Sequence, residues 1–226
     1  MKREDAWKLL NEMMSNKNLI RHGLAVEFIM RDLCNYLRER EGSEKSGTSP
    51  EILRFAQNDK QDSGQAGMTV NKHTIDNVER EFDEEEWAVV GLLHDADYEL
   101  IEKDPTKHTL VTAEKLRELG VSERIIEAIK AHHFGIKPQR DNILESAVYS
   151  ADEMSGLITA CALVKERKLS NVSVETVLKK FPEKNFAAGA RRDQILEGIV
   201  ELEISLEVFT KIALEAMQKH HEELGL

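Results

Sequence analysis

The sequence has few cysteines, prolines and aromatic residues, and each scarcity excludes a class of protein. Its 226 residues include two cysteines, four prolines and 5% aromatic side chains. Two cysteines cannot form a disulfide framework, and Cys34 and Cys161 lack the Cys-x-x-Cys spacing of redox or metal sites. We therefore expect a reducing compartment, the cytoplasm, and a chain with few proline breaks in its helices.

Long apolar runs and an excess of positive charge are also missing. The first residues, MKREDAWKLL, contain no apolar core of a signal peptide, and no stretch approaches the 18 apolar residues of a membrane span. Lys plus Arg number 31 against 42 for Asp plus Glu, which gives a net charge of −11. General binding to nucleic acid or to a membrane surface depends on positive charge. We therefore expect neither a nucleic-acid coat nor a membrane partner.

Apolar residues recur at steps of three and four through most of the chain, which predicts an all-α protein. Asp83, Ser122 and Asn142 stand where helix N-caps are expected, and no stretch alternates like a strand. We expect one domain over 1–226 with eight or nine helices. Their approximate ranges are 4–15, 18–40, 74–82, 83–95, 105–120, 122–133, 142–163, a short helix from 173, and 192–221.

One stretch, from about residue 41 to residue 73, departs from this pattern. It is rich in Ser, Gly, Asn, Gln and charge, and Phe55 is its only aromatic residue. Such a segment buries too little apolar surface to offset the entropy lost on ordering. We predict a polar, flexible surface insertion, with a lid or an interface element as the alternative.

Several imidazoles and carboxylates fall on the apolar faces or at the ends of these helices. His22 continues the apolar stripe of its helix, and Asp152 lies four residues after Val148 on an inward face. A single inward histidine is usually a hydrogen-bonded core residue, but a buried carboxylate is costly unless it is paired or metal-bound. Such groups can share a cation, and they suit Mn, Fe, Co or Zn better than Mg. The candidates are His22, His94, Asp95, His108, His132 and Asp152.

The segments that carry these residues resemble the HD-domain metal-dependent phosphohydrolase superfamily. They read RHGLAVEFIM, GLLHDADYE, AIKAHH and SADEMSGL, with His108 between the second and the third. The order His, His-Asp, His, His, Asp is similar to the superfamily's dinuclear pattern, and the chain looks most like a branch of small, standalone HD hydrolases. The resemblance covers nearly everything except about 41–73. It implies a single HD-type helical domain.

The resemblance also implies roles for the candidates. His22, His94, Asp95 and Asp152 would hold one divalent metal, and Asp95 would bridge to a second held by His108 and His132. One or two ions are expected, and Mn, Fe, Co, Ni, Zn and Mg all stay open. His133 matches a second histidine of some branches, as a phosphate contact, a further ligand or an orienting group, or else as a polar helix end. Asp97 stands where other branches have Gly, and either orients a ligand or caps a helix.

The implied reaction is hydrolysis of a nucleotide or another small phosphorylated metabolite, as a monoester or a diester, by a metal-activated hydroxide. Arg21, Lys107, Arg191 and Arg192 are the cations that would bind the substrate, with Arg192 preferred; the alternative for each is a solvated surface charge. Two other functions stay open, an HD-fold di-iron oxygenase and a non-catalytic metal-binding helical module. The apolar spacing of the last helix favours core packing, with a homodimer seam as the alternative.

Overall fold

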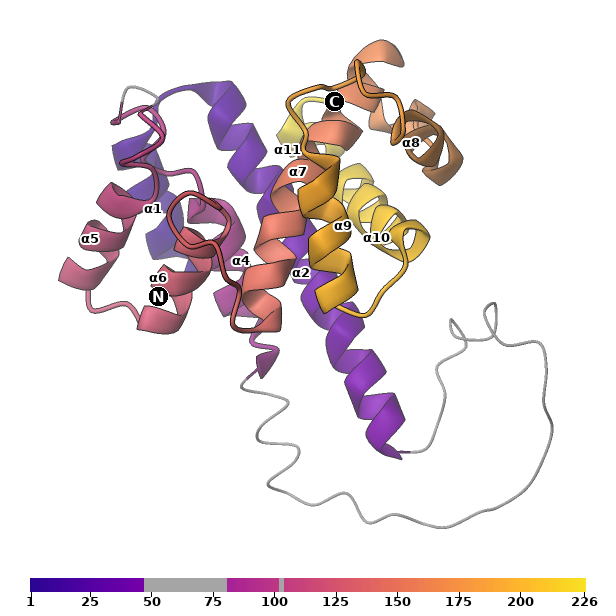
Figure 1. The fold of residues 1–226 in the computed structure, drawn as a ribbon. Helices are drawn as coiled ribbons and strands as arrows, with labels where there is room; N and C mark the ends of the chain where they lie inside the picture. The colour runs from indigo at the N-terminus through magenta and orange to yellow at the C-terminus, as the bar shows by residue number, and fades with distance from the viewer. Residues whose placement is uncertain (47–80, 102–103) are drawn as a thin grey trace.

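The computed structural model describes residues 1–46, 81–101 and 104–226, and in these ranges the chain is all-helical (Figure 1). The all-α prediction is confirmed. The described elements are α1 (Arg3–Met13), α2 (Lys17–Ser46), α4 (Glu84–Leu93), α5 (Leu110–Glu118), α6 (Glu123–Ala131), α7 (Ile143–Val164), a 3₁₀ turn (Leu169–Asn171), α8 (Val174–Lys180), α9 (Arg192–Glu201), α10 (Leu206–Lys219) and α11 (His221–Leu224).

Helices α2 and α7 form the centre of the domain. Figure 1 shows α1, α4, α5 and α6 on one side of this pair and α8 to α11 on the other. Both central helices pack against both groups, and their inward faces are fully buried, for example at Ile29, Leu33 and Val148. A residue on the inner face of α2 or α7 therefore lies where the two halves of the domain meet.

Two glycines bring α2 and α4 into backbone contact. A Cβ atom added to Gly91 would lie 2.9 Å from the backbone of Glu27, and one added to Gly23 would lie 2.9 Å from the carbonyl oxygen of Leu92. Real Cβ atoms do not approach backbone atoms this closely, so only glycine fits at either position without a shift. The close approach brings His22 of α2 beside His94, the residue that follows α4.

Two of the predicted N-caps carry the expected hydrogen bonds. The Asp83 side chain accepts from the backbone N–H groups of Glu85 and Glu86, and the Asn142 side chain accepts from that of Glu145. Ser122 occupies the N-cap position of α6 without a side-chain cap bond. Capping of this kind begins α4 and α7 at the residues that the sequence indicates.

Several predicted boundaries are wrong. The single helix expected over 192–221 is divided into α9, α10 and α11, which makes ten α-helices in the described residues instead of eight or nine. Its first break follows Leu202: Glu203 has a left-handed φ of 55°, and the Ser205 hydroxyl accepts from Val208 to begin α10. The helix expected from residue 105 begins at Leu110, after a series of turns.

The predicted insertion lies mostly outside the described residues. Helix α2 continues to Ser46, so the boundary expected at 41 is too early. Residues 47–80 include the rest of the insertion and nearly all of the helix expected over 74–82. In the described part of the chain, no helix combines the length and the apolar composition that a membrane crossing needs.

Gly91 supplies a test of the α2–α4 contact. We expect Gly91→Ala to destabilise the protein by about 1–3 kcal/mol, because the methyl group forces the two backbones apart. Gly42→Ala, also in α2, is the matched control, since a Cβ atom there meets nothing within 4 Å. Thermal and urea unfolding measure both variants, and a Gly91→Ala protein as stable as the control would contradict the account.

Candidate metal centre

The six residues singled out in the sequence come together from separate elements. His22 lies in α2, His94 and Asp95 follow α4, His108 precedes α5, His132 follows α6, and Asp152 lies in α7. His94, His108 and His132 are 0, 5 and 4% exposed. The sequence order therefore corresponds to one spatial cluster at the junction of the two halves.

Asp95 divides the cluster into two groups. Its Oδ2 atom lies 3.6 Å from His22 Nε2 and 3.7 Å from His94 Nε2. Its Oδ1 atom lies 3.0 Å from His108 Nε2 and 3.4 Å from His132 Nε2. We call His22, His94 and Asp95 the first group and Asp95, His108 and His132 the second group; each has three potential ligand atoms close enough to share one ion.

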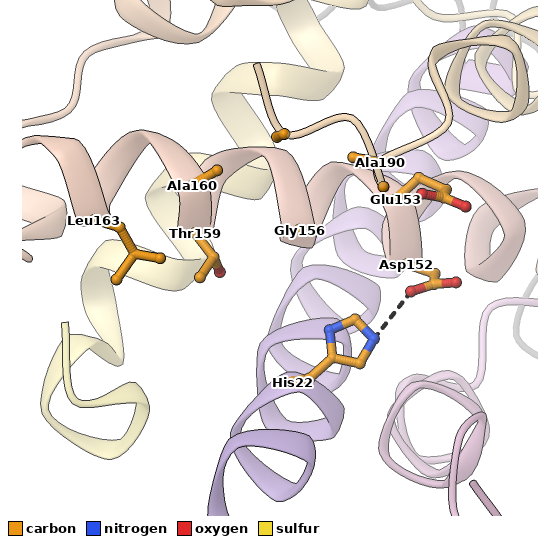
Figure 2. A pocket seen from close by; sticks show the side chains of 10 residues that line it. His22, Asp152, Glu153, Gly156, Thr159, Ala160, Leu163 and Ala190 are labelled. Atoms are coloured by element: carbon orange, nitrogen blue, oxygen red, sulfur yellow. Dashed lines mark ion pairs between the residues drawn. The ribbon is translucent and has the colours of Figure 1, made fainter. Parts of the chain in front are cut away.

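Asp152 joins the first group from α7. Its Oδ1 atom lies 3.0 Å from His22 Nε2 and 3.6 Å from His94 Nε2. Figure 2 shows the His22 ring directed toward this carboxylate. The arrangement groups the residues as the family resemblance implies, with Asp95 common to both groups; their role as ligands stays a prediction.

Hydrogen bonds fix the tautomers of two histidines through backbone carbonyl groups. His94 Nδ1 lies 2.8 Å from the oxygen of Gly91, and His132 Nδ1 lies 2.6 Å from the oxygen of Ile129. A carbonyl oxygen only accepts, so each Nδ1 carries the hydrogen and donates. Each Nε2 of the neutral ring therefore has a lone pair, which faces the cluster.

Side chains fix the other two histidines in the same way. His108 Nδ1 lies 3.0 Å from Asp97 Oδ1, and a carboxylate only accepts. His22 Nδ1 lies 3.1 Å from the Ser155 hydroxyl, which itself donates to the backbone oxygen of Asp152 at 2.8 Å. The Ser155 hydrogen is therefore engaged, so His22 Nδ1 donates. Outer partners that orient imidazole in this way are typical of metal sites.

In the neutral rings, the four Nε2 lone pairs therefore face one another in two pairs. His22 Nε2 and His94 Nε2 lie 3.1 Å apart, and His108 Nε2 and His132 Nε2 lie 3.0 Å apart. Two imidazole lone pairs at this separation repel each other unless a proton or a cation lies between them. The donor set of nitrogen and carboxylate oxygen therefore fits a divalent transition metal in each group.

The carboxylates make the cluster attractive to positive charge. Burial lowers the pKa of His22, but Asp152 and Asp95 raise it to about 9. Burial also lowers the pKa of His108, which Asp95 and Asp97 raise to about 9. Burial raises the pKa of Asp95, yet the neighbouring histidines hold it well below its usual range. Without a metal, the site holds protons in its place.

Asp97 both orients a histidine and caps a helix. Besides His108, its carboxylate accepts from the backbone N–H groups of Thr109 and Thr112, each at 3.1 Å. Thr109 has a left-handed φ of 67°, which is costly for a branched residue. The three hydrogen bonds to the buried carboxylate stabilise this turn and, with it, the position of His108.

An open cavity of about 510 Å³ exposes the second group. Tyr98, His133, Phe134, Glu153, Arg191 and Gln194 line it together with Asp95, His108, His132 and Asp152. The His133 ring lies edge-on to that of His108, and its buried Nδ1 has no hydrogen-bond partner in the described residues. His133 therefore lies beside the second group on the cavity wall.

The four predicted substrate-binding cations lie in different places. Arg191 lines this cavity. Arg192 does not, because its guanidinium donates to the carbonyl groups of the 181–190 segment at Phe181, Phe186, Ala187 and Ala190. Lys107 is exposed and lies 3.5 Å from Asp104, and Arg21 lines a separate cavity beside His22. Of these four residues, Arg191 is the one that lines the cavity of the second group.

Glu153 is a site residue that the sequence reasoning missed. It follows Asp152 directly, lines the cavity, and accepts from the backbone N–H of Arg191 at 2.7 Å. Burial and the charge of Asp152 raise its pKa to about 8. Its position next to Asp152 is the only signal in the sequence.

A family model described as HD domain matches residues 19–157, which is more than half of the chain. The protein belongs to the HD-domain family. The matched range contains all six residues of the cluster, and the superfamily consists mostly of metal-dependent hydrolases. A search of curated proteins and a search of solved structures each give no significant match.

Asp95 is the shared member of both groups, which gives a direct test of the HD-domain cluster. We expect Asp95→Ala to remove nearly all bound metal from both groups while the helix content stays unchanged. Elemental analysis after dialysis and circular dichroism measure the two quantities. Asp5→Ala, at an aspartate 59% exposed in α1, is the control. Full metal content in Asp95→Ala would show that the cluster is wrongly assigned.

Metal binding to this centre is expected to depend on pH. His22 and His108 have pKa values raised to about 9 without metal, so both hold a proton at pH 7, and a metal ion must displace it. Apparent affinity for Mn²⁺ should therefore rise from pH 6 to pH 9, with proton release at neutral pH. Titration calorimetry in buffers of different ionisation enthalpy measures this release, and affinity independent of pH would argue against it.

Proposed function

We propose that the protein is a metal-dependent phosphohydrolase that acts on a nucleotide or another small phosphorylated metabolite. The observation that supports this most strongly is the pair of ligand groups that share Asp95 on the wall of an open cavity. Divalent ions held by these residues would lower the pKa of water and neutralise the charge on a phosphate.

The charge of the protein makes phosphate binding conditional on metal. Asp95, Asp97 and Asp152 keep pKa values below their usual range, and protons on His22 and His108 offset only two of these three negative charges in the metal-free site. A phosphate would be repelled from such a surface, whereas bound divalent cations reverse its sign. An acidic protein can therefore bind an anionic substrate at this position.

Three side chains have defined tasks in this proposal. Arg191 would bind a non-bridging phosphate oxygen, because its guanidinium is the cation on the cavity wall. His133 would contact the phosphate or the leaving oxygen, because its imidazole lies on the cavity wall. Asp97 would keep His108 in the tautomer with a free Nε2 lone pair.

A screen of phosphorylated metabolites tests the function. Protein stripped of metal should be inactive, and Mn, Co, Ni, Zn, Fe and Mg, each added separately, should restore hydrolysis to different degrees. Released phosphate or the new phosphomonoester is measured. If no metal supports hydrolysis, the proposal is wrong. Oxidation of an organic substrate by the iron-loaded protein in air would instead support a di-iron oxygenase, and absence of both activities would support a non-catalytic module.

Substitutions of the two neighbouring arginines should distinguish an effect on catalysis from an effect on stability. Arg191 is exposed and its guanidinium pairs with Asp193, so Arg191→Gln should lower kcat/KM about 10- to 100-fold with an unchanged melting temperature. Arg192→Gln should lower stability by roughly 1.5–3 kcal/mol, because partly buried carbonyl groups lose a charged donor. The opposite pattern would restore Arg192 as the substrate-binding residue.

A cytoplasmic location and a homodimer stay predictions.

A further inference from the structure

The candidate metal centre opens to cavities on two sides. The second group faces the cavity of about 510 Å³ described above. His22 and Asp152, which belong with the first group, line another cavity of about 380 Å³ (Figure 2). Asp152 and Glu153 line both cavities, so the two lie next to each other across this pair of residues. We call the cavity of about 380 Å³ the α7 cavity.

The α7 cavity has a largely apolar lining. Its floor is one face of α7, where Asp152, Gly156, Ala160 and Leu163 follow at steps of three and four. Figure 2 shows these residues in a row that leads away from the Asp152 carboxylate, with Ala190 of the neighbouring segment beside them. Small side chains on both sides leave room for the organic part of a ligand, not for a second charged group.

Packing does not require the glycine in this floor. A Cβ atom at Gly156 would meet only Ala190 Cβ, at an ordinary distance of 3.9 Å. At Gly198, by contrast, it would lie 2.7 Å from Ser150, so that glycine is needed for close packing. Glycine inside a helix costs about 0.5–1 kcal/mol relative to alanine. At Gly156 no close packing contact offsets this cost, and the missing side chain leaves the cavity open.

The α7 cavity continues into a third cavity that two arginines line. The third cavity measures about 370 Å³ and shares His22, Gly156, Thr159 and Leu163 with the α7 cavity. Arg21 and Arg167 line it. Because an α-helix rises 1.5 Å per residue, the floor from Asp152 to Leu163 is about 16 Å long. A ligand at the metal centre can therefore extend along α7 toward Arg167, which follows the end of this helix.

A phosphomonoester has one organic group on phosphorus and would occupy one of these directions. A phosphodiester has two, one on each side of phosphorus. We propose that the substrate is a phosphodiester, with one organic arm in the cavity of the second group and the other along the α7 cavity, ending in an anionic group near Arg167. This inference rests on the proposed phosphohydrolase function.

Hydrolysis of such a substrate needs no partner except water. The oxygen of water forms a bond to phosphorus, and one ester P–O bond breaks. One proton of the water goes to the departing alcohol oxygen, and the other stays with the new phosphomonoester. The products are therefore one alcohol and one monoester.

The test compares esters that share one chromophore. Bis(p-nitrophenyl) phosphate is the diester probe and p-nitrophenyl phosphate is the monoester probe, each with the metal that gives the highest rate. The wild-type protein should hydrolyse the diester with the higher kcat/KM. Gly156→Leu fills the α7 cavity and should lower kcat/KM for the diester about tenfold or more, with little change for the monoester. Val164→Leu, at a position 63% exposed on the same helix, is the matched control.

The anionic end of the arm has its own probe pair. Two p-nitrophenyl alkyl phosphates of equal length, one ending in a carboxylate and one in a methyl group, separate charge from size. Arg167→Gln should raise KM about tenfold for the carboxylate-ended ester alone, because an exposed guanidinium acts on the charged end group. Equal effects on both esters would overturn the placement of the anionic end.

Other outcomes separate this inference from the function on which it rests. If the monoester is the better substrate and Gly156→Leu leaves both rates unchanged, the diester inference is overturned and the phosphohydrolase function stands. If no ester is hydrolysed with any metal, both fail. If Gly156→Leu melts below the assay temperature, Ala160→Leu fills the same cavity one turn later and decides the outcome.

Discussion

The mutual approach of four imidazole lone pairs around one carboxylate is the constraint on which the structure depends. Each outer nitrogen donates to a fixed acceptor, so each Nε2 points its lone pair at another Nε2 about one hydrogen-bond length away. Neutral rings cannot tolerate this arrangement without positive charge between them. The fold holds the groups in place all the same, through glycine contacts between α2 and α4 and through the Asp97 turn before α5.

Several elements of the fold contribute close contacts, hydrogen bonds or backbone strain that hold this arrangement in place. Gly91 lets α4 approach α2, Ser155 orients His22 from α7, and Thr109 takes a left-handed backbone conformation beside His108. None of these features is needed by a helical bundle that only buries apolar surface. They are explained together if the centre of the domain exists to hold a cation.

Much of this was predictable from the sequence, because imidazoles and carboxylates on apolar helix faces need partners of their own kind or a cation. The positions of His22 and Asp152 on inward faces and the caps at Asp83 and Asn142 were correct. The prediction of a single helix over 192–221 was wrong. Its apolar spacing continues across the turn at Glu203, and the left-handed backbone conformation of that residue is not visible in the sequence. Which of Arg191 and Arg192 lines the cavity depended on carbonyl groups of the 181–190 segment, whose path no helical pattern in the sequence predicts. The sequence alone does not single out Gly156, because the open space beside it depends on how the neighbouring segments pack.

The central claim is that a divalent ion occupies the space between these lone pairs. Anomalous diffraction from a crystal of the protein grown with Mn²⁺ tests it most directly. We predict an anomalous peak about 2.0–2.3 Å from His22 Nε2, His94 Nε2 and an Asp95 oxygen, with a second peak between Asp95, His108 and His132 if two ions bind. Peaks only at surface carboxylates, or none at all at saturating Mn²⁺, would contradict the account.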